Sequence, residues 1–307
     1  MPLSMNVAKA VKVDEFYTLM KDVEAELHHY SHFFNGKSIF CCCDNPQFSN
    51  FCEYFRINYK VLGIKRLICS WFQKGNTTAK WAEYDVTREQ FIIHIMDGDG
   101  SFDSEGCKSL MNEADIIVTN PPFSKSRLFI EFLITHNKKF VIVCNRNTII
   151  TKKIFPLLMN QTIKFGYGFQ GNTGNFMIPK SLYGHYSNDV VRKEQNIVRF
   201  RNVSWLTNLD IHISHKKLPL NKKFSRKEYK FYDQYNAINV DKISDIPYDY
   251  YGEMGVPITI LDKFDYTQYE LLGLDRFMPS NSKGRRFTIE GKEKYARVLI
   301  RKKVQNE

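Results

Sequence analysis

The segment that most constrains the fold of this chain is residues 115–123, with the sequence DIIVTNPPF. Its β-branched residues 116–118 are typical of a short strand that is buried on both faces of a sheet. The two prolines that follow cannot donate a hydrogen bond to a neighbouring strand, so the strand ends there. Because a residue before proline favours extended geometry, we expect Asn120 to be held stiffly at the carboxyl end of this strand.

Asn120 is therefore expected where open α/β sheets bind their ligands, outside the carboxyl ends of the strands. It offers a side-chain amide oxygen and a backbone carbonyl, and the aromatic ring of Phe123 follows closely. Two acceptors beside a ring are suited to hold the exocyclic amino group of a flat base that stacks on the ring. The alternative is a strand that ends in a Pro-Pro turn and a phenylalanine of the core. The position directly after an aliphatic strand favours the binding site.

The composition of the chain indicates a globular protein with a basic surface. Its 307 residues suffice for one large domain or two modest ones, and 43% are hydrophobic. Lys and Arg number 44 against 33 Asp and Glu, and the net charge of +11 favours a polyanionic partner, although basic proteins without one are common. No apolar run approaches the ~20 residues that span a bilayer, and the N-terminus lacks a signal-like apolar core. We therefore expect a cytoplasmic protein that does not bind a membrane.

The cysteines and acidic residues do not form a metal-binding pattern. Three of the seven cysteines are consecutive at 41–43, and none has Cys-x-x-Cys zinc spacing. We expect reduced, buried thiols. Residues 97–103 (DGDGSFD) suggest a calcium loop, but Phe102 and Lys108 stand where such a loop needs glycine and glutamate. The sequence predicts no metal site.

Strands and helices alternate along the chain around residues 115–123. Strands are expected at 37–43, 65–71, 116–118, 139–144 and 205–213, and helices at 19–30, 49–58 and 125–136. This succession predicts a Rossmann-like, doubly wound and mainly parallel α/β sheet. The polar residues 74–88 are expected to form an edge hairpin or a loop insertion. Residues 44–46 (DNP) form a tight acidic turn after the first strand, where the chain lacks a glycine-rich turn.

Short strings spread over nearly the whole chain resemble, in order, the EcoRI-type family of adenine-specific DNA methyltransferases. They are DEFYT at 14–18, CDNPQFSNF at 43–51, DGDGSF at 97–102, NPPF at 120–123, WLTNLD at 205–210, YNAINV at 235–240 and GVPIT at 255–259. The resemblance implies the class I methyltransferase fold and S-adenosylmethionine as the cofactor. It also implies duplex DNA as the partner and methylation of an adenine that is flipped out of the helix.

The resemblance also implies which residues contact the cofactor. They are Phe16, Tyr17, Thr18, Cys43, Asp44, Asn45, Pro46, Asp97, Asp99 and Asn120. Asp99, with Asp97 as the second choice, would accept a hydrogen bond from the adenine amine of the cofactor. No carboxylate follows the strand at 65–71, so the group that binds the ribose stays open.

The target adenine is assigned to the NPPF motif on the same resemblance. The catalytic residues would be Asn120, Pro121, Pro122 and Phe123. The side-chain oxygen of Asn120 and the carbonyl of Pro121 would accept the two amine hydrogens, and Phe123 would stack on the base. Residues 166–179 match the position of a loop that closes over the base, so Phe176 is expected to pack against it. A turn in a hairpin would explain the same composition.

The pattern changes beyond about residue 180. We expect residues 1–214 to form the catalytic domain and residues 215–307 to form a mixed α/β target-recognition region packed on it. Basic and aromatic side chains there can contact phosphates and base edges, although a solvated surface is the alternative for each. They include Lys216, Lys217, Lys222, Lys223, Arg226, Lys227, Tyr229 and Tyr232. Residues 285–303 are expected to form a two-stranded ribbon with one buried and one basic face.

The resemblance thus implies the modification enzyme of a prokaryotic or phage restriction-modification system. We expect a monomer that shares its site with a cognate endonuclease without a stable complex, and GAATTC is the first site to test. Other interpretations are methylation of an RNA adenine or of a protein glutamine amide, or a nucleic-acid-binding protein without catalysis. The long basic and aromatic C-terminal region favours nucleic acid over a protein substrate.

Overall fold

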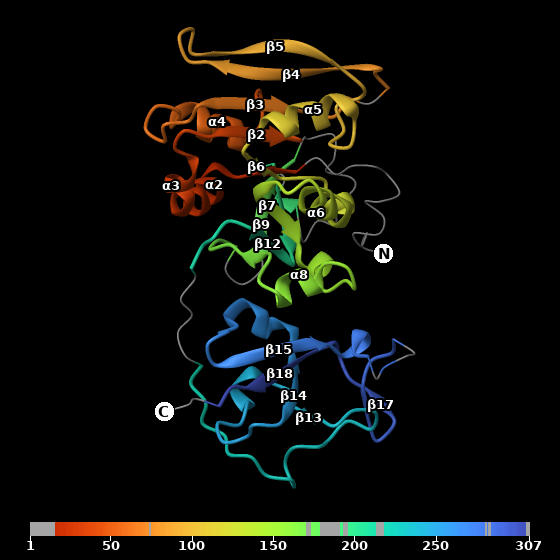
Figure 1. The fold of residues 1–307 in the computed structure, drawn as a ribbon. Coiled ribbons are helices and arrows are strands. Elements are labelled where there is room, and N and C mark those ends of the chain that lie inside the picture. The colour runs from red at the N-terminus through yellow and green to blue at the C-terminus, as the bar shows by residue number, and fades with distance from the viewer. Residues whose placement is uncertain are drawn as a thin grey trace. The chain divides into compact units, whose positions relative to one another are not determined.

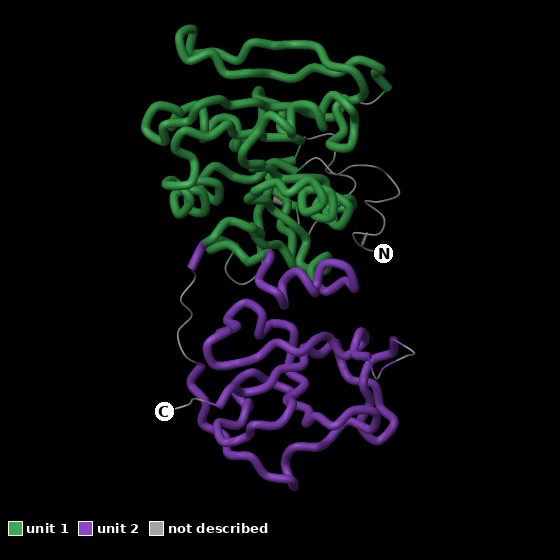
Figure 2. The backbone as a smooth tube through the Cα atoms, in the orientation of Figure 1, with its two compact units in different colours: residues 1–149, 163–210 green, residues 150–162, 211–307 purple. Residues whose placement is uncertain are grey.

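The computed structural model describes residues 16–73, 75–169, 173–178, 191–192, 196–212, 218–279, 281 and 284–304. The chain divides into two compact units (Figure 2). Unit 1 comprises residues 1–149 and 163–210, and unit 2 comprises residues 150–162 and 211–307. Residues 150–162 thus belong with the C-terminal part of the chain, which the sequence patterns did not predict.

Unit 1 is built on an eight-stranded mixed sheet, ordered β5-β4-β3-β2-β6-β7-β12-β8 (Figure 1). Its four central strands are parallel: β3 (Arg66–Ser70), β2 (Ser38–Cys42), β6 (Ile116–Thr119) and β7 (Lys139–Asn145). Antiparallel strands flank them: β4 (Thr78–Asp85) and β5 (Gln90–Asp97) on one side, β12 (Val203–Thr207) and β8 (Lys164–Phe165) on the other. A mixed α/β fold with a large, partly parallel sheet is therefore confirmed.

The helices of unit 1 precede, connect or follow its parallel strands. They are α2 (Met20–Leu27), α3 (Ser31–Phe34), α4 (Asn50–Ile57), α5 (Glu105–Glu113), α6 (Ser126–Thr135) and α7 (Arg146–Ile149). The side chains of Ser49 and Ser104 cap α4 and α5 by accepting a hydrogen bond from a first-turn backbone N–H. From β2 the chain passes through α4 to β3, whereas β6 pairs with the other edge of β2. The order of strands therefore reverses between β2 and β6, which is where such sheets bind ligands.

The core of unit 1 explains why these strands are central. Every residue of β2 and of β6 is buried, as the aliphatic sequences predict for strands covered on both faces. Each fully buried large apolar side chain stabilises the fold by ~1.5–3 kcal/mol relative to an exposed one. The largest fully buried side chains of unit 1 include Phe34, Phe40, Phe55, Phe129, Phe140 and Trp205.

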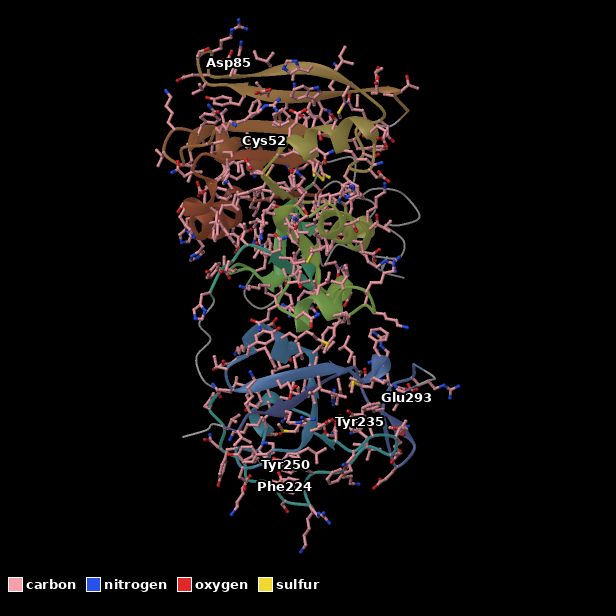
Figure 3. All side chains as sticks on the ribbon, in the orientation of Figure 1. Cys52, Asp85, Phe224, Tyr235, Tyr250 and Glu293 are labelled. Atoms are coloured by element: carbon pink, nitrogen blue, oxygen red, sulfur yellow. The ribbon has the colours of Figure 1, made fainter. Side chains whose placement is uncertain are left out.

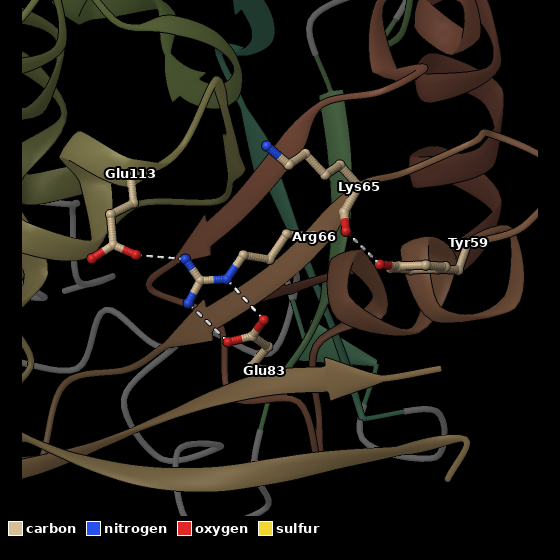
Figure 4. A network of polar contacts seen from close by, with 5 residues as sticks. All are labelled: Tyr59, Lys65, Arg66, Glu83 and Glu113. Atoms are coloured by element: carbon tan, nitrogen blue, oxygen red, sulfur yellow. Dashed lines mark hydrogen bonds and ion pairs between the residues drawn. The ribbon is translucent and has the colours of Figure 1, made fainter. Parts of the chain in front are cut away.

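The hairpin β4–β5 extends the sheet at its edge; an edge hairpin was expected at residues 74–88, but only β4 lies within them and β5 follows at Gln90–Asp97. Arg66 of β3 holds it in place (Figure 4). Its guanidinium donates to both carboxylate oxygens of Glu83 on β4 at 2.8 Å and to Glu113 on α5 at 2.5 Å. The Arg66 side chain is 26% exposed, so these ion pairs are partly shielded from water.

A second, smaller sheet of unit 1 has the order β1-β9-β11-β10. Its strands are antiparallel: β1 (Tyr17–Thr18), β9 (Thr173–Met177), β11 (Ile197–Arg201) and β10 (Val191–Arg192). Thr18 pairs with Phe176, which in turn pairs with Val198. Residues 17–18 of the N-terminal string and residues 176–177 of the predicted base-closing segment are therefore neighbours in space.

Unit 2 contains a four-stranded sheet ordered β13-β14-β18-β15. The strands are β13 (Ile238–Asn239), β14 (Glu253–Pro257), β18 (Arg297–Lys302) and β15 (Tyr269–Leu274), with a separate hairpin of β16 (Thr288–Ile289) and β17 (Lys292–Glu293). The short helix α8 (Phe155–Met159) packs on β15, and the Tyr266 hydroxyl donates to the Leu158 carbonyl at 2.9 Å. At one end of the unit, the rings of Phe224 and Tyr250 lie 4.4 Å apart (Figure 3).

Two expectations for this region are wrong. The ribbon at 285–303 exists only as β16–β17, because β18 is an interior strand and is not half-exposed. Arg297 is only 5% exposed, since its guanidinium donates to the side chains of Asn239 and Asp241. Tyr229 and Tyr232 are also buried, with hydroxyls that donate to Asp245 and Asn239, so they support the fold instead of facing a partner.

We predict that Leu299→Ala destabilises unit 2 by ~2–5 kcal/mol, because it leaves a cavity in the cluster of Tyr232, Ala237, Phe287 and Ile289. Urea unfolding followed by tyrosine fluorescence measures the change. The control is Val304→Ala, whose side chain is 71% exposed and should shift the free energy of unfolding by less than ~0.5 kcal/mol. Equal effects of the two substitutions would contradict the assignment of Leu299 to the core.

Candidate active site

The turn after β2 adopts a backbone conformation that usually requires glycine. The backbone N–H groups of Cys43 and Asp44 both donate to the Ser70 carbonyl at the end of β3, at 2.9 and 2.7 Å. Cys43 has φ = 122°, in the region that L-residues rarely adopt. Strained backbone of this kind persists where the surroundings hold it and is common at binding sites. The turn therefore achieves the sharp bend of a glycine-rich turn without a glycine.

The carboxylate of Asp44 joins this turn to the strand that carries the NPPF motif. Asp44 is 5% exposed and accepts hydrogen bonds from Ser49 Oγ at 2.6 Å and Thr119 Oγ1 at 2.5 Å. The backbone N–H of Asn120 is a third donor. Burial outweighs these donors and raises the pKa of Asp44 to about 7. Because groups of the protein itself donate to this carboxylate, Asp44 fixes the geometry of the edge at which open α/β sheets generally bind ligands.

The rest of the turn is closed by local hydrogen bonds. The Asn45 side-chain oxygen accepts from the Gln47 backbone N–H at 3.0 Å, and Pro46 lies between them, half-buried. Asn45 also accepts, through its carbonyl, from the N–H groups of Phe48 and Ser49. The turn is thus rigid up to the first residue of α4.

Asn120 lies at the end of β6 with its side chain fixed and one oxygen unsatisfied. Its Nδ2 donates to the Phe16 backbone carbonyl at 2.6 Å. Its Oδ1 is buried and has no hydrogen-bond partner among the described residues. A buried acceptor without a partner costs ~1–3 kcal/mol, so this oxygen suits a ligand that brings an N–H donor.

An aromatic cluster lies beside Asn120. The Phe123 ring is 5.6 Å from the ring of Phe16, 5.7 Å from Phe176 and 6.0 Å from Phe200. Phe123 is 8% exposed and Phe176 is fully buried. Phe200 was not predicted from the sequence, although the alternation along β11 (IVRFR) could have indicated an inward-facing ring. The structure brings together Phe16, Phe123 and Phe176 from three distant parts of the sequence.

Residues 16–18 of the N-terminal string contact both α4, which follows the turn, and Asn120. The Thr18 carbonyl accepts from Asn50 Nδ2 at 2.7 Å, and the buried Thr18 hydroxyl has no partner among the described residues. The Tyr17 ring lies 6.2 Å from Phe48. Asn50 was not singled out before, although it belongs to the string at 43–51.

The acidic turn after β5 lies at the carboxyl end of β3. The Asp99 carbonyl accepts from the Gln73 N–H at 2.7 Å, and its Oδ1 accepts from the Ser101 N–H at 2.9 Å. A Cβ on Gly100, which has φ = 77°, would lie 2.2 Å from the Trp71 carbonyl oxygen. Hydrogen bonds from Ser101 lower the pKa of Asp99, so it is an ionised acceptor, whereas Asp97 is exposed at the end of β5.

The basic residues predicted to bind DNA belong to unit 2. Lys223, Arg226 and Lys227 are exposed. Lys222 is exposed as well but pairs with Glu228 at 2.8 Å. Lys216 and Lys217 lie outside the described residues.

Three buried thiols lie together beneath the turn. The sulfur atoms of Cys41, Cys52 and Cys69 are within 4.8 Å of one another, although their sequence spacing gave no sign of this (Cys52 is labelled in Figure 3). All seven cysteines are free. Burial raises the pKa of the Cys41 and Cys69 thiols, as expected for small core side chains.

The site thus combines an open α/β sheet with an unpaired buried acceptor, an aromatic cluster and an NPPF motif, which lie where the strand order reverses between β2 and β6. The family model of the adenine-specific methyltransferase EcoRI matches residues 4–303. The chain belongs to this family. It is thus an adenine-specific DNA methyltransferase, and the resemblance seen in the sequence is confirmed.

Three similar proteins align with this chain over almost its whole length. The type II methyltransferase M.EcoRI of Escherichia coli is 38% identical over 97% of this chain and 96% of its own. M.MpnI of Mycoplasma pneumoniae is 31% identical and M.MgeORF184P of Mycoplasma genitalium 33% identical, each over 97% of this chain and 98% of the relative. No solved structure matches the chain. Among the described residues of this methyltransferase, no helix has the length and apolar character needed to cross a membrane.

We predict that Asp44 makes folding stability depend on pH. Its folded-state pKa of about 7 lies above the ~3.9 of an unfolded aspartate, so the folded state binds the proton more tightly. The contribution of this group is fully present below about pH 4 and is lost as the pH rises to about 7. The thermal midpoint of the parent should therefore fall more steeply over this range than that of Asp44→Asn.

The control for this comparison is Asp103→Asn, which alters an exposed carboxylate close to the same edge of the sheet. Its thermal midpoint should follow the parent at every pH. A parent and an Asp44→Asn variant with parallel pH profiles would show that Asp44 titrates normally.

Proposed function

We propose that this enzyme transfers a methyl group from S-adenosylmethionine to the exocyclic amine of an adenine flipped out of duplex DNA. The observation that carries the proposal is the unpaired, buried Oδ1 of Asn120 beside the ring of Phe123. We further propose that it is the modification enzyme of a type II restriction-modification system. GAATTC is the first site to test, because M.EcoRI is among the similar proteins.

The role of Asn120 is to make a poor nucleophile reactive. The lone pair of an adenine amine is delocalised into the ring. Asn120 Oδ1 and the Pro121 carbonyl can accept the two amine hydrogens, which favours a tetrahedral nitrogen with an available lone pair. The hydrogen bond from Nδ2 to the Phe16 carbonyl keeps the oxygen aimed at the substrate, so its orientation is established before the base arrives.

The role of Phe123 is to stack on the flipped base. Flipping costs a few kcal/mol, and one stacking contact recovers ~1–3 kcal/mol. Phe16, Phe176 and Phe200 pack against Phe123 and keep its ring in place, and Pro122 stiffens the backbone before it. Because stacking barely balances the cost of flipping, interactions with the DNA backbone must supply the remaining affinity, as the net charge of +11 favours.

The cofactor would lie along the edge formed by β2, β3 and β6. When bound, it supplies an activated methyl group on its sulfonium. The chain offers the predicted contacts Phe16, Tyr17, Thr18, Cys43, Asp44, Asn45, Pro46, Asp97, Asp99 and Asn120. The unpaired Thr18 hydroxyl and the ionised Asp99 at the end of β3 support this placement, with Asp99 favoured over the exposed Asp97 as the acceptor for the adenine amine.

We propose a Rossmann-like, doubly wound sheet for the catalytic part. The connections β2–α4–β3 and β6–α6–β7 run in opposite directions along the sheet, and right-handed crossovers then place α4 and α6 on opposite faces. Residues 1–214 would carry catalysis and residues 215–307 target recognition. We propose a cytoplasmic monomer that acts on DNA without a stable complex with its endonuclease.

The proposed function is tested by incubating the protein with labelled S-adenosylmethionine and genomic DNA, then mapping methylated adenines by sequencing. Methylation at one short sequence supports it. Label transferred only to RNA or only to protein would show that the substrate is not DNA. Calorimetry that detects no cofactor binding would indicate a catalytically silent nucleic-acid-binding protein.

We predict that Asn120→Ala lowers turnover by on the order of 10²-fold, because a preorganised acceptor is removed. Cofactor affinity, measured by calorimetry, should change far less. Asn112→Ala is the control, since Asn112 is exposed on α5 and should leave turnover unchanged. If Asn120→Ala turns over as fast as the parent, the Asn120 side chain has no role in catalysis.

We predict that replacing Lys223, Arg226 and Lys227 with Gln weakens binding to all DNA sequences alike. The salt dependence of log K should flatten by about one unit for each phosphate that the variant no longer neutralises. Lys60→Gln removes one charge from unit 1, where the side chain is 76% exposed, and is the control that should leave the slope unchanged. Unaltered salt dependence in the triple variant would show that other residues bind the phosphates.

A further inference from the structure

A buried carboxylate that the proposed chemistry does not use lies on α2. Glu26 has no exposed surface, and its carboxylate accepts a hydrogen bond from the Tyr30 hydroxyl at 2.6 Å. Both oxygens accept from the backbone N–H of Tyr167 at 3.0 Å, and Oε2 also accepts from the backbone N–H of Gly168. Glu26 thus binds a loop that follows it by about 140 residues in the sequence.

The loop is shaped to accept this carboxylate. A Cβ on Gly166 would lie 2.0 Å from Glu26 Oε1, and one on Gly168 would lie 3.0 Å from Glu26 Oε2 and 2.9 Å from Trp205 Nε1. The Tyr167 ring stacks on His29 with centroids 3.9 Å apart. Glycine is therefore required at position 166 for the backbone to approach Glu26 so closely, and there is little room for a Cβ at position 168.

From this loop, stacked and edge-on rings lead directly to the aromatic cluster. Phe169 follows Gly168 and stacks on Trp205, with centroids 5.6 Å apart and planes inclined by 12°. Phe169 also faces Phe176 at 5.8 Å, and Phe176 meets Phe123 edge-on at 5.7 Å. A displacement of residues 166–168 would therefore remove the support behind the ring proposed to stack on the target base.

We propose that Glu26 is a positioning residue, whose carboxylate clamps residues 166–168 so that Phe169 and Phe176 hold Phe123 in place for the target adenine. The clamp is a property of the free protein, and its effect on methylation rests on the proposed function. A carboxylate is required because each of its oxygens accepts from a backbone N–H, which can only donate: both oxygens share the Tyr167 N–H, and Oε2 also accepts from the Gly168 N–H. In Glu26→Gln, the NH₂ group would oppose one of these donors.

The clamp is tested directly by hydrogen exchange of the free protein. The protection of the peptide that covers residues 166–169 should fall at least tenfold in Glu26→Gln. Glu24→Gln, on the same helix but exposed, should keep parental protection. Tyr30→Phe removes one donor and leaves both backbone hydrogen bonds, so it should also keep the loop protected. Parental protection in Glu26→Gln overturns the clamp.

The consequence for the reaction is tested once the methylated site of the parent is known. Glu26→Gln should lower kcat by about 10-fold to 100-fold, as expected when a reacting group is misplaced by about 1 Å. It should also reduce the fluorescence of 2-aminopurine at the target position, with an unchanged Kd for S-adenosylmethionine. If Glu26→Gln loses protection of the loop but keeps the kcat and the fluorescence of the parent, Glu26 does not position Phe123 for the reaction.

A second variant decides the matter if Glu26→Gln does not fold. Gly166→Ala leaves the carboxylate intact and pushes the loop away from it, because the added Cβ would lie 2.0 Å from Glu26 Oε1 and 2.6 Å from Trp205 Cβ. It should reproduce the fall in loop protection and in kcat, and parental values for both would overturn the proposal. A parent that methylates no adenine, with protection still reduced in both variants, would refute the proposed function and leave the clamp standing.

Discussion

The hydrogen bonds of the Asp44 carboxylate hold together the elements from which the proposed active site is built. Ser49 is the N-cap of α4, Thr119 is the last residue of β6, and Asn120 carries the unpaired acceptor. The carboxylate binds all three at the point where the strand order of the sheet reverses. Without it, the turn after β2 and the NPPF motif would lose the buried group that binds both of them directly.

A similar restraint acts on Asn120. Its amide nitrogen is bound to the Phe16 carbonyl, and two prolines restrict the backbone that follows. The side chain therefore cannot turn its oxygen away without breaking a hydrogen bond in the protein. The free protein bears the cost of one buried, unsatisfied acceptor so that the site needs no rearrangement when a donor arrives.

Patterns of local sequence predicted the elements that local chemistry determines. The parallel strands β2, β3, β6 and β7 and the helices α4 and α6 lie within one or two residues of the expected ranges, because aliphatic runs and serine or proline boundaries mark them. The strand expected at 205–213 is instead β12, at Val203–Thr207.

What the patterns missed depends on residues distant in the sequence. The two-residue strand β1 exists only because β9 pairs with it, and Phe200 joins the aromatic cluster through β11. Glu26 had no signal at all, since an acidic residue on a short, surface-like helix is ordinary until its partners are known.

The place of α8 in unit 2 has a consequence for how the enzyme is made and how it evolves. Residues 150–162 leave the ribosome well before β15, the strand on which α8 packs, so this segment must wait for almost the whole chain before it can dock. Unit 1, by contrast, has all of its described strands by residue 207. Recombination that exchanged only the C-terminal third would separate α8 from the surface it evolved with. New specificities that arise by such exchange must therefore either carry both segments or repair the packing between them.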